Sequence, residues 1–374
     1  MNLRAHWMRG GTSKCWVLER AALQKTGFTA DAVLPRIFGS PDVRQLDGVG
    51  GATSTTSKAM IVSRSESEDI DVEFTFAQVG IEEAKVDWGS NCGNCSSVVG
   101  LYAIEQGWVA PGQDVTEVRT LNTNTRQTII QTIPTPGRQL PESLTSIVPG
   151  TVFPGHSVQL GFLSPEGRTT GKLLPTGDAI SQITVGDTTA EVTLIDAGAP
   201  LAVIDAVKFG FPAETYDDWF DQASTQLESI ESIRREAAVA MGLARTPDEA
   251  ERAIPKIGLI SRSTDGASDL QVLMLSMGKP HPAMPITGSV GVSVAAQTQG
   301  TVVANSLAEP SGHELRIRIP GGVLSTFTED SSLGRTVGVY RTARTLADAN
   351  LPITADQLQG TAASQSEEDS KCRV

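Results

Sequence analysis

The chain has 374 residues, enough for two domains that each bury a core of their own. With 39% hydrophobic and 20% charged residues, it has the composition of a globular protein, which excludes a disordered or fibrous chain. The formal net charge of −13 disfavours nucleic acid and anionic membrane surfaces as partners, because both would be repelled at long range.

Short β-branched runs punctuated by glycine and proline predict a structure dominated by strands. In chain order, strands are expected at 58–65, 70–79, 128–133, 156–163, 182–198, 201–207, 256–263, 270–277, 300–307 and 313–322. Residue patterns and glycine stops predict helices at 95–107, 217–243, 289–300 and 341–351. The proline-rich segment 133–156 is expected to be a loop, and the polar tail 361–374 to be loose.

The first candidate site is the loop "MRGGTSK", which combines Arg9, two glycines, Thr12 and Ser13. Hydroxyls and backbone N–H groups in such a loop can bind a carboxylate. An ordinary hairpin turn explains the same residues.

The second candidate is "LDGVGGATSTTSKAMIVS", a glycine loop and a hydroxyl run that lead through Ser54 to Lys58. A lysine partly screened from water at a loop-to-strand junction can act as an acid or base, or can pair with a carboxylate. The run lacks the spacing of a phosphate loop. A solvated lysine on a flexible loop is the competing interpretation.

The third candidate is "WGSNCGNCSS", where Cys92 and Cys95 stand just before and within a predicted helix start. The helix dipole there would attract a carboxylate and lower the pKa of the Cys92 thiol. Two small buried residues at a tight turn are the alternative. A zinc site or a redox pair is disfavoured, because no second Cys-x-x-Cys exists, the histidines lack ligand spacing, and glycine and asparagine separate the thiols.

The fourth candidate is "MGKPHPAMPITGSVGVSVAA", which places Lys279 and His281 just before a second predicted helix start. His281 stands between two prolines, so a turn histidine is the competing interpretation. Laying the two glycine-closed helices over each other pairs Cys95 with Gly288 and Cys92 with Pro285. This register suggests an internal duplication, although chance similarity of two small-residue helices would give the same match.

Together the stretches "MRGGTSK", "LDGVGGATSTTSK", "SNCGNCSS", "DAGAP", "ITGSVGVSVAA" and "YRTARTL" resemble, in order and spacing, the 2-methylaconitate cis–trans isomerase (PrpF-like) family of the diaminopimelate epimerase superfamily. The resemblance implies an α/β (α+β) fold of two pseudo-symmetric domains, each a curved, mostly antiparallel sheet or barrel around a central helix, with the active site in the cleft. The expected division is 1–185, 186–345 and a C-terminal segment 346–374 that packs back on the first domain.

The resemblance also implies a cofactor-independent isomerase that moves protons on an unsaturated di- or tricarboxylate. Aconitate or 2-methylaconitate is the favoured substrate, with 4-oxalomesaconate and methylitaconate as alternatives. Lys58 and Cys92 correspond to the catalytic residues. The expected substrate contacts are Arg9, Thr12, Ser13, Ser54, Asn91, Gly93, Asn94, Lys279, His281, Thr287, Gly288 and Ser289.

Two departures from the superfamily narrow this expectation. Pro285 stands where diaminopimelate epimerases use a second cysteine, which argues against an amino-acid racemase or epimerase. Ala199 replaces an asparagine common among relatives, so substrate contacts there are expected to differ. A non-catalytic carboxylate-binding protein of the same fold remains an alternative.

The expected partner is a small carboxylate, with no metal, nucleic acid or membrane, and a homodimer is compatible with this interpretation. Four cysteines without a disulfide pattern predict free thiols. The absence of an apolar signal core predicts a cytoplasmic location.

Overall fold

The computed structural model describes residues 1–89, 91–252, 254–276, 278–353 and 358. The chain divides into two compact units, one formed by 1–160 with 341–374 and the other by 161–340. The domain boundaries expected near 185 and 345 remain predictions. The tail 361–374, including Cys372, lies outside the described residues.

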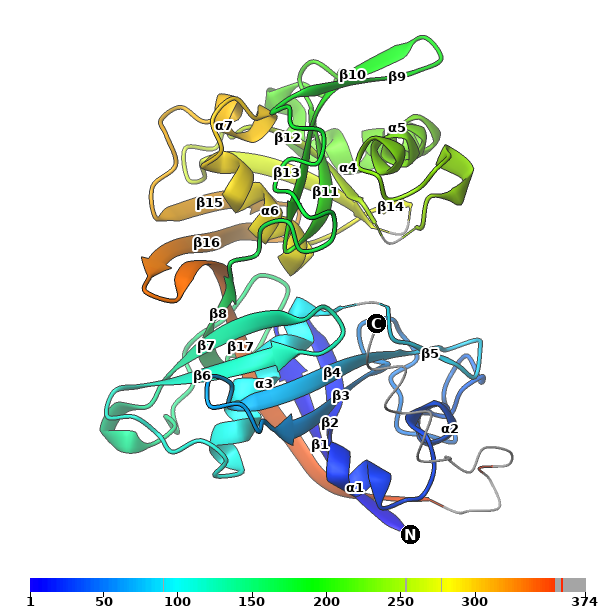
Figure 1. The fold of residues 1–374 in the computed structure, drawn as a ribbon, viewed down its shortest axis with the longest axis vertical. Helices are drawn as coiled ribbons and strands as arrows, with labels where there is room; N and C mark the ends of the chain where they lie inside the picture. The colour runs from blue at the N-terminus through cyan, green and yellow to red at the C-terminus, as the bar shows by residue number, and fades with distance from the viewer. Residues whose placement is uncertain (90, 253, 277, 354–357, 359–374) are drawn as a thin grey trace. The chain divides into compact units, whose positions relative to one another are not determined.

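The first unit consists of a curved sheet and three α-helices (Figure 1). Its elements are β1 (Asn2–Gly10), β2 (Ser13–Glu19), α1 (Arg20–Gln24), α2 (Ala30–Phe38), β3 (Lys58–Arg64), β4 (Val72–Val79), β5 (Val86–Asp87), α3 (Gly93–Glu105), β6 (Val115–Asn122), β7 (Gln127–Pro134) and η1 (Pro136–Arg138). The strands β8 (His156–Leu163) and β17 (Gly334–Pro352) each contain one of the two points where the chain passes between units.

The second unit repeats this order with longer helical connections. Its elements are β9 (Ser181–Val185), β10 (Thr188–Ala197), β11 (Ala199–Asp205), η2 (Ala213–Asp218), α4 (Trp219–Thr225), α5 (Leu227–Ala240), η3 (Pro247–Glu249), β12 (Lys256–Arg262), β13 (Leu270–Ser276), β14 (Lys279–Pro280), α6 (Ile286–Ala296), α7 (Val302–Ser306), β15 (Glu314–Ile319) and β16 (Gly322–Ser331).

Strand pairing is the same in the two units. In the first, β1 and β2 pair antiparallel, β2 and β3 parallel, β3 and β4 antiparallel, β4 and β6 parallel, and β6 and β7 antiparallel. The strands β10, β11, β12, β13, β15 and β16 pair in the same order and with the same directions. The predicted duplication is therefore confirmed at the level of topology.

Each unit is built around one helix that is apolar on all sides. Helix α3 contacts β1, β2, β3, β4, β6 and β7, and α6 contacts β10, β11 and β16. Every residue of α6 is buried, as are all residues of α3 except Asn94 and Glu105. A helix without a polar face requires cover on every side, which the curved sheet supplies.

Four sequence predictions of secondary structure are wrong. The segment expected as a single strand at 182–198 forms two antiparallel strands, β9 and β10, joined by a turn. The segment expected as a helix at 341–351 belongs to strand β17, because its backbone pairs antiparallel with β1 from Gly10↔Ala343 to Asn2↔Pro352. The segment expected as a strand at 300–307 holds helix α7, which Thr301 caps by accepting a hydrogen bond from the Ala304 N–H at 3.0 Å. The single helix expected at 217–243 is broken into η2, α4 and α5.

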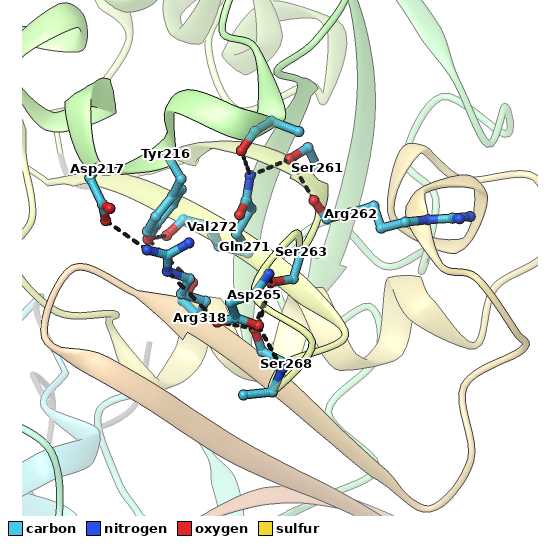
Figure 2. A network of polar contacts seen from close by, with 12 residues as sticks. Tyr216, Asp217, Ser261, Arg262, Ser263, Asp265, Ser268, Gln271, Val272 and Arg318 are labelled. Atoms are coloured by element: carbon cyan, nitrogen blue, oxygen red, sulfur yellow. Dashed lines mark hydrogen bonds and ion pairs between the residues drawn. The ribbon is translucent and has the colours of Figure 1, made fainter.

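The hairpins β3–β4 and β12–β13 show how closely the two units correspond. Asp71 donates its N–H to the Arg119 carbonyl, and its carboxylate accepts the Arg119 N–H, both at 2.8 Å. Asp269 and Arg316 make the same two bonds at 2.8 Å. The turns differ, because in the second unit Asp265 accepts hydrogen bonds from Ser263, Ala267 and Ser268 (Figure 2).

Within the described residues, none of the helices combines the length and the apolar character that a membrane span requires.

Candidate active site

Lys58 is the first residue of β3, and its side chain is buried despite its charge. Its Nζ donates a hydrogen bond to Oε1 of Gln78, the residue opposite it on β4, and lies 5.0 Å from the centre of the Phe76 ring. Gln78 is oriented in turn by donating to the Ser57 carbonyl at 2.9 Å. A neutral amide and an aromatic face therefore hold the amine in place, as residues of an acid/base site should.

The loop before Lys58 is fixed by a residue that sequence reasoning missed. The buried Gln45 accepts hydrogen bonds at Oε1 from the Ser57 hydroxyl at 2.7 Å and from the Ala52 N–H at 2.8 Å. A Cβ on Gly50 would lie 2.0 Å from the same oxygen, which explains the glycine there. Ser54 is exposed on this loop. Only the close glycine spacing of "DGVGG" could have hinted at such packing.

The turn between β1 and β2 packs against the first turn of α3. A Cβ on Gly10 would lie 2.2 Å from the Asn94 carbonyl oxygen, and one on Gly11, whose φ is +49°, would lie 2.2 Å from Asn94 Oδ1. Asn94 Nδ2 donates to Thr12 Oγ1 at 3.1 Å. Two loops that are far apart in sequence thus present hydroxyl and amide groups together at the start of the helix.

Cys92 is the N-cap residue of α3, and its side chain makes no capping hydrogen bond. Its Sγ lies 4.0 Å from the hydroxyl of the buried Ser13. Interaction with the Cys95 thiol and burial raise the pKa of Cys92 well above its ordinary value, although the charge of Lys58 acts to lower it. The expectation that the helix dipole gives a low thiol pKa is therefore wrong, because these two effects exceed the attraction of nearby positive charge.

The Cys-x-x-Cys spacing forms no disulfide. Cys15, Cys92 and Cys95 are free thiols, and burial raises the pKa of Cys95 as well. Across the described ranges, no three His, Cys, Asp or Glu side chains are arranged to hold a metal ion.

Three further predicted residues of the first unit lie around this turn. Asn91 accepts a hydrogen bond from Asn122 at 2.9 Å, and Gly93 is the buried first residue of α3. The Arg9 guanidinium donates to four protein oxygens: Gly11 O at 3.1 Å, Thr342 Oγ1 at 2.9 Å, Phe153 O at 3.4 Å and Pro154 O at 3.2 Å. Arg9 therefore holds neighbouring loops together in this structure.

The predicted residues of the second unit lie on β14, in the turn after it and in the first turn of α6. Lys279 is exposed on β14, where it pairs with Ser276. His281 accepts a hydrogen bond at Nδ1 from the Ala283 N–H at 3.0 Å, and burial lowers its pKa. The imidazole is thus held as a neutral ring in a turn.

The first turn of α6 contains Thr287, Gly288 and Ser289, all buried, and Pro285 is the N-cap residue of this helix. The Ser289 hydroxyl donates to the Ile286 carbonyl at 2.7 Å, within the helix. A Cβ on Gly198 would lie 3.2 Å from the Thr287 carbonyl, just as one on Gly10 would approach Asn94. This contact confirms the register that pairs Asn94 with Thr287.

The first unit therefore brings Thr12, Ser13, Cys92 and Asn94 together, with the Lys58 charge close enough to act on the thiol. Backbone N–H groups at the start of a helix bind anions such as carboxylates. A protonated thiol and a buried amine beside such a cradle have the groups needed to move a proton on a bound carboxylic acid.

The PrpF protein family model matches residues 1–353 of the chain. A 2-methyl-aconitate isomerase from Shewanella oneidensis is 35% identical over 353 residues, which cover 87% of this chain and 88% of that protein. A (4E)-oxalomesaconate Δ-isomerase from a Novosphingobium species is 36% identical over 349 residues, covering 91% and 95%.

The fold is also that of a known isomerase. The crystal structure of a methylitaconate-Δ-isomerase matches with a TM-score of 0.85 at 29% identity, covering 98% of this chain and 99% of that one. This likeness confirms the predicted fold class, and it extends over both units.

Proposed function

Because this chain belongs to the PrpF protein family, as its motifs predicted, we propose that it shifts or cis–trans isomerises the double bond of aconitate or 2-methylaconitate. Its relatives show that the chain is an isomerase of unsaturated carboxylates. The proposed route is proton abstraction followed by reprotonation at the far allylic carbon, in the cytoplasm and without a cofactor.

One observation carries the proposal. The buried amine of Lys58, held by Gln78, is close enough to the Cys92 thiol for its charge to act on the thiol pKa. An amine that accepts a proton and a thiol that stays protonated form a base and an acid beside one cradle for an anion.

In the proposed mechanism, Lys58 takes a proton from the carbon next to the double bond. The C–H electron pair then spreads over the former double bond and the carboxylate, giving a dienolate-like anion. Cys92 or the Lys58 ammonium returns a proton to the far allylic carbon, and the double bond moves. Rotation before this step gives cis–trans exchange. If Cys92 donates, its thiolate regains a proton from the Lys58 ammonium, which restores both groups.

Carboxylate binding is assigned first to the groups around α3. The N–H groups of Gly93 and Asn94 and the hydroxyls of Thr12, Ser13 and Ser54 would stabilise the anion as charge develops. One such preorganised donor is typically worth about 3 kcal/mol of barrier. Stabilisation of this size is needed because a carbon next to a carboxylate is a weak acid.

We also propose roles for the other residues that the sequence predicted as substrate contacts. Asn91 and Arg9 would support this cradle, with Arg9 positioning the loops that it holds. In the second unit, the proposed carboxylate contacts are Lys279, His281, Thr287, Gly288 and Ser289.

The relatives favour two alternative substrates. Oxalomesaconate and methylitaconate appear in the names of proteins that resemble this chain over nearly its full length. These acids differ from aconitate by small substituents, and one methylene changes discrimination by only about 1–3 kcal/mol. An epimerase acting on amino acids is disfavoured because Pro285 stands where that chemistry needs a thiol.

The test is ¹H NMR of each acid with the protein in D₂O. The wild type is expected to convert one of them and to introduce solvent deuterium. Lys58→Ala should lower the rate by about 10³-fold, because the base is lost. Lys25→Ala, at an exposed residue of the same unit, is the matched control. Deuterium exchange at the wild-type rate in Lys58→Ala would refute the mechanism, and a carboxylate that binds without exchange would favour a non-catalytic protein.

A further inference from the structure

The amine of Lys58 belongs to a row of three polar side chains that crosses the first sheet. Lys58 on β3 is opposite Gln78 on β4, and Gln78 is opposite Asp87 on β5. Residues directly opposite one another on neighbouring strands point to the same face of the sheet. Amine, amide and carboxylate therefore follow one another in this order, and the amide separates the two groups that can carry charge.

The orientation of the Gln78 amide is fixed by its other partner. Its Nε2 donates to the Ser57 carbonyl at 2.9 Å, and a carbonyl can only accept, so Oε1 must face the Nζ of Lys58. Ser57 is itself held, because its carbonyl also accepts the Val79 N–H at 3.0 Å and its hydroxyl donates to Gln45 at 2.7 Å. The amide therefore cannot turn its NH₂ group toward the amine without losing a hydrogen bond.

The acid in this row lies too far from the amine to form an ion pair with it. Neighbouring strands are about 4.8 Å apart, so the backbones of Lys58 and Asp87 are separated by about 10 Å. Charges at that separation are largely screened by salt at about 0.1 M. Asp87 is also exposed, and its Oδ1 accepts the Gly89 N–H at 2.9 Å. A carboxylate in place of Gln78 would instead contact the amine and stabilise its ammonium form strongly.

The titratable groups on the other elements around Lys58 are thiols and a second lysine. From α3, Cys92 and Cys95 lie close enough for the Lys58 charge to act on both, and their pKa values are nevertheless raised by burial and by neighbouring thiols, so both stay protonated. From β2, which pairs with β3, come the buried thiol of Cys15 and, at the same end of the strand, Lys14. These neighbours therefore place no carboxylate against the amine.

We propose that Gln78 is the positioning residue of Lys58: its amide oxygen fixes the amine, and its lack of charge leaves the amine able to exchange protons. This inference rests on the proposed function, in which Lys58 is the base, and extends it by one residue. A base must release its own proton before it takes one from the substrate, and a carboxylate in contact would oppose that release. An amide gives the amine the same hydrogen bond with much less electrostatic attraction.

The first test is Gln78→Glu, which keeps the acceptor and adds a charge. The titration midpoint of Lys58, followed by NMR of protein labelled at lysine, should rise by about 1–2 pH units. With the acid that the wild type converts, kcat at pH 7 should fall about 10- to 100-fold and recover as the pH is raised. Gln24→Glu makes the same change at an exposed residue of this unit and should alter neither quantity.

The second test is Gln78→Met, which keeps the length of the side chain and removes the amide. Because the amine loses its anchor, kcat should fall about 10-fold at every pH, with KM within about 3-fold of wild type. This variant also serves if Gln78→Glu fails to fold, since one carboxylate oxygen would then face the Ser57 carbonyl. Circular dichroism of each variant reports whether it is folded.

Two results would overturn the proposal. One is a Lys58 titration midpoint in folded Gln78→Glu that stays within about 0.3 pH units of wild type. The other is a kcat in folded Gln78→Met within about 2-fold of wild type. A wild type that converts none of the acids would instead contradict the proposed function, and the NMR titration, which needs no turnover, would still test the effect of Gln78 on Lys58.

Discussion

The starts of α3 and α6 are packed in the same way but differ in their polar side chains. At each, a turn between two antiparallel strands packs its glycine against the second residue of the helix, Gly10 on Asn94 and Gly198 on Thr287. Around α3 that turn has one residue more, because Gly10 pairs with Ser13 whereas Ala197 pairs with Ala199. This longer turn contains Thr12, whose hydroxyl accepts a hydrogen bond from Asn94.

The two halves of the duplication therefore share their packing at the helix start and differ in the side chains that could take part in chemistry. Cys92 and Ser13 of the first unit correspond to Pro285 and Ala199 of the second, which have no hydroxyl or thiol. We therefore expect proton transfer to depend on the first unit.

The largest expected effect is on packing. Gly10→Ala would place a Cβ 2.2 Å from the backbone oxygen of Asn94, so the turn or the helix must move, and we expect a loss of about 3 kcal/mol of unfolding free energy. Gly198→Ala meets its nearest atom at 3.1 Å and has a φ of +72°, which should cost about 1 kcal/mol. Urea denaturation of both variants measures the difference, and equal losses would break the comparison.

Next comes the thiol. Cys92→Ser replaces the thiol by a hydroxyl, which is a much weaker acid, so kcat should fall about 100-fold, equivalent to about 2.7 kcal/mol. Pro285→Ala alters the matching residue of α6 and should change kcat by less than about 2-fold. Deuterium incorporation reports both. Full activity in Cys92→Ser would mean that the thiol transfers no proton and that Lys58 carries out both proton transfers.

The third effect concerns the hairpin turns. Burial would raise the pKa of Asp265, but hydrogen bonds from Ser268, Ala267 and Ser263 lower it to about 2 (Figure 2). Because the folded pKa is depressed, the ionised carboxylate contributes a stabilisation that is present above pH 4 and is lost as the pH falls from about 4 to 2; solvent screening at this exposed residue reduces it to about 1 kcal/mol. Asp265→Asn should therefore be less stable than wild type at pH 7 and similar to it near pH 2.

The matched control for that turn is Ser67→Ala. Ser67 stands 198 positions before Asp265, and its hydroxyl accepts a weak hydrogen bond from the Asp69 N–H at 3.4 Å. Its loss should change stability by less than about 0.5 kcal/mol at either pH. Thermal melts of both variants at pH 2 and pH 7 measure these changes in stability. A loss of stability in Asp265→Asn that is the same at both pH values would contradict the role of the ionised carboxylate.

The smallest effect is expected at the paired helix positions. Asn94→Ala removes the bond to Thr12, worth about 1 kcal/mol, and should raise KM about 5-fold. Thr287→Ala should change KM by less than about 5-fold if the polar groups at the start of α3 contribute more to substrate binding than those at the start of α6. A larger effect at Thr287 would reverse the assignment of the two helix starts.

The sequence predicted those parts of the fold that rest on local pattern. The glycine-closed helices, their register and most strands follow from small residues, β-branched runs and stops, and the structure confirms them. Strand β17 could not be predicted in this way, because its conformation is imposed by pairing with β1, more than 300 residues away. Helix α7 was missed because a threonine cap overrides the strand preference of two valines.

For the candidate site, the motifs located Lys58, Cys92 and Asn94, but the groups that hold them are long-range partners. Gln45 and Gln78 carry no local signal, since an amide acquires a role only through what it meets in the folded chain. The raised pKa of Cys92 could not be predicted either, because its main causes are the neighbouring Cys95 thiol and burial, and both depend on the folded chain.

The path of β17 bears on the order in which the protein can assemble during synthesis. All of the second unit, 161–340, has been made before the chain returns to the first, whose opening strand β1 pairs with 343–352. The first residue completes its own bonds last, since Met1 and Ile353 exchange backbone hydrogen bonds at 2.8 Å. Domains usually mature from the N-terminus as they emerge. Here the unit that begins first must wait until residues 343–352 have been made, so a chain truncated after residue 340 should contain a finished second unit and an open first one.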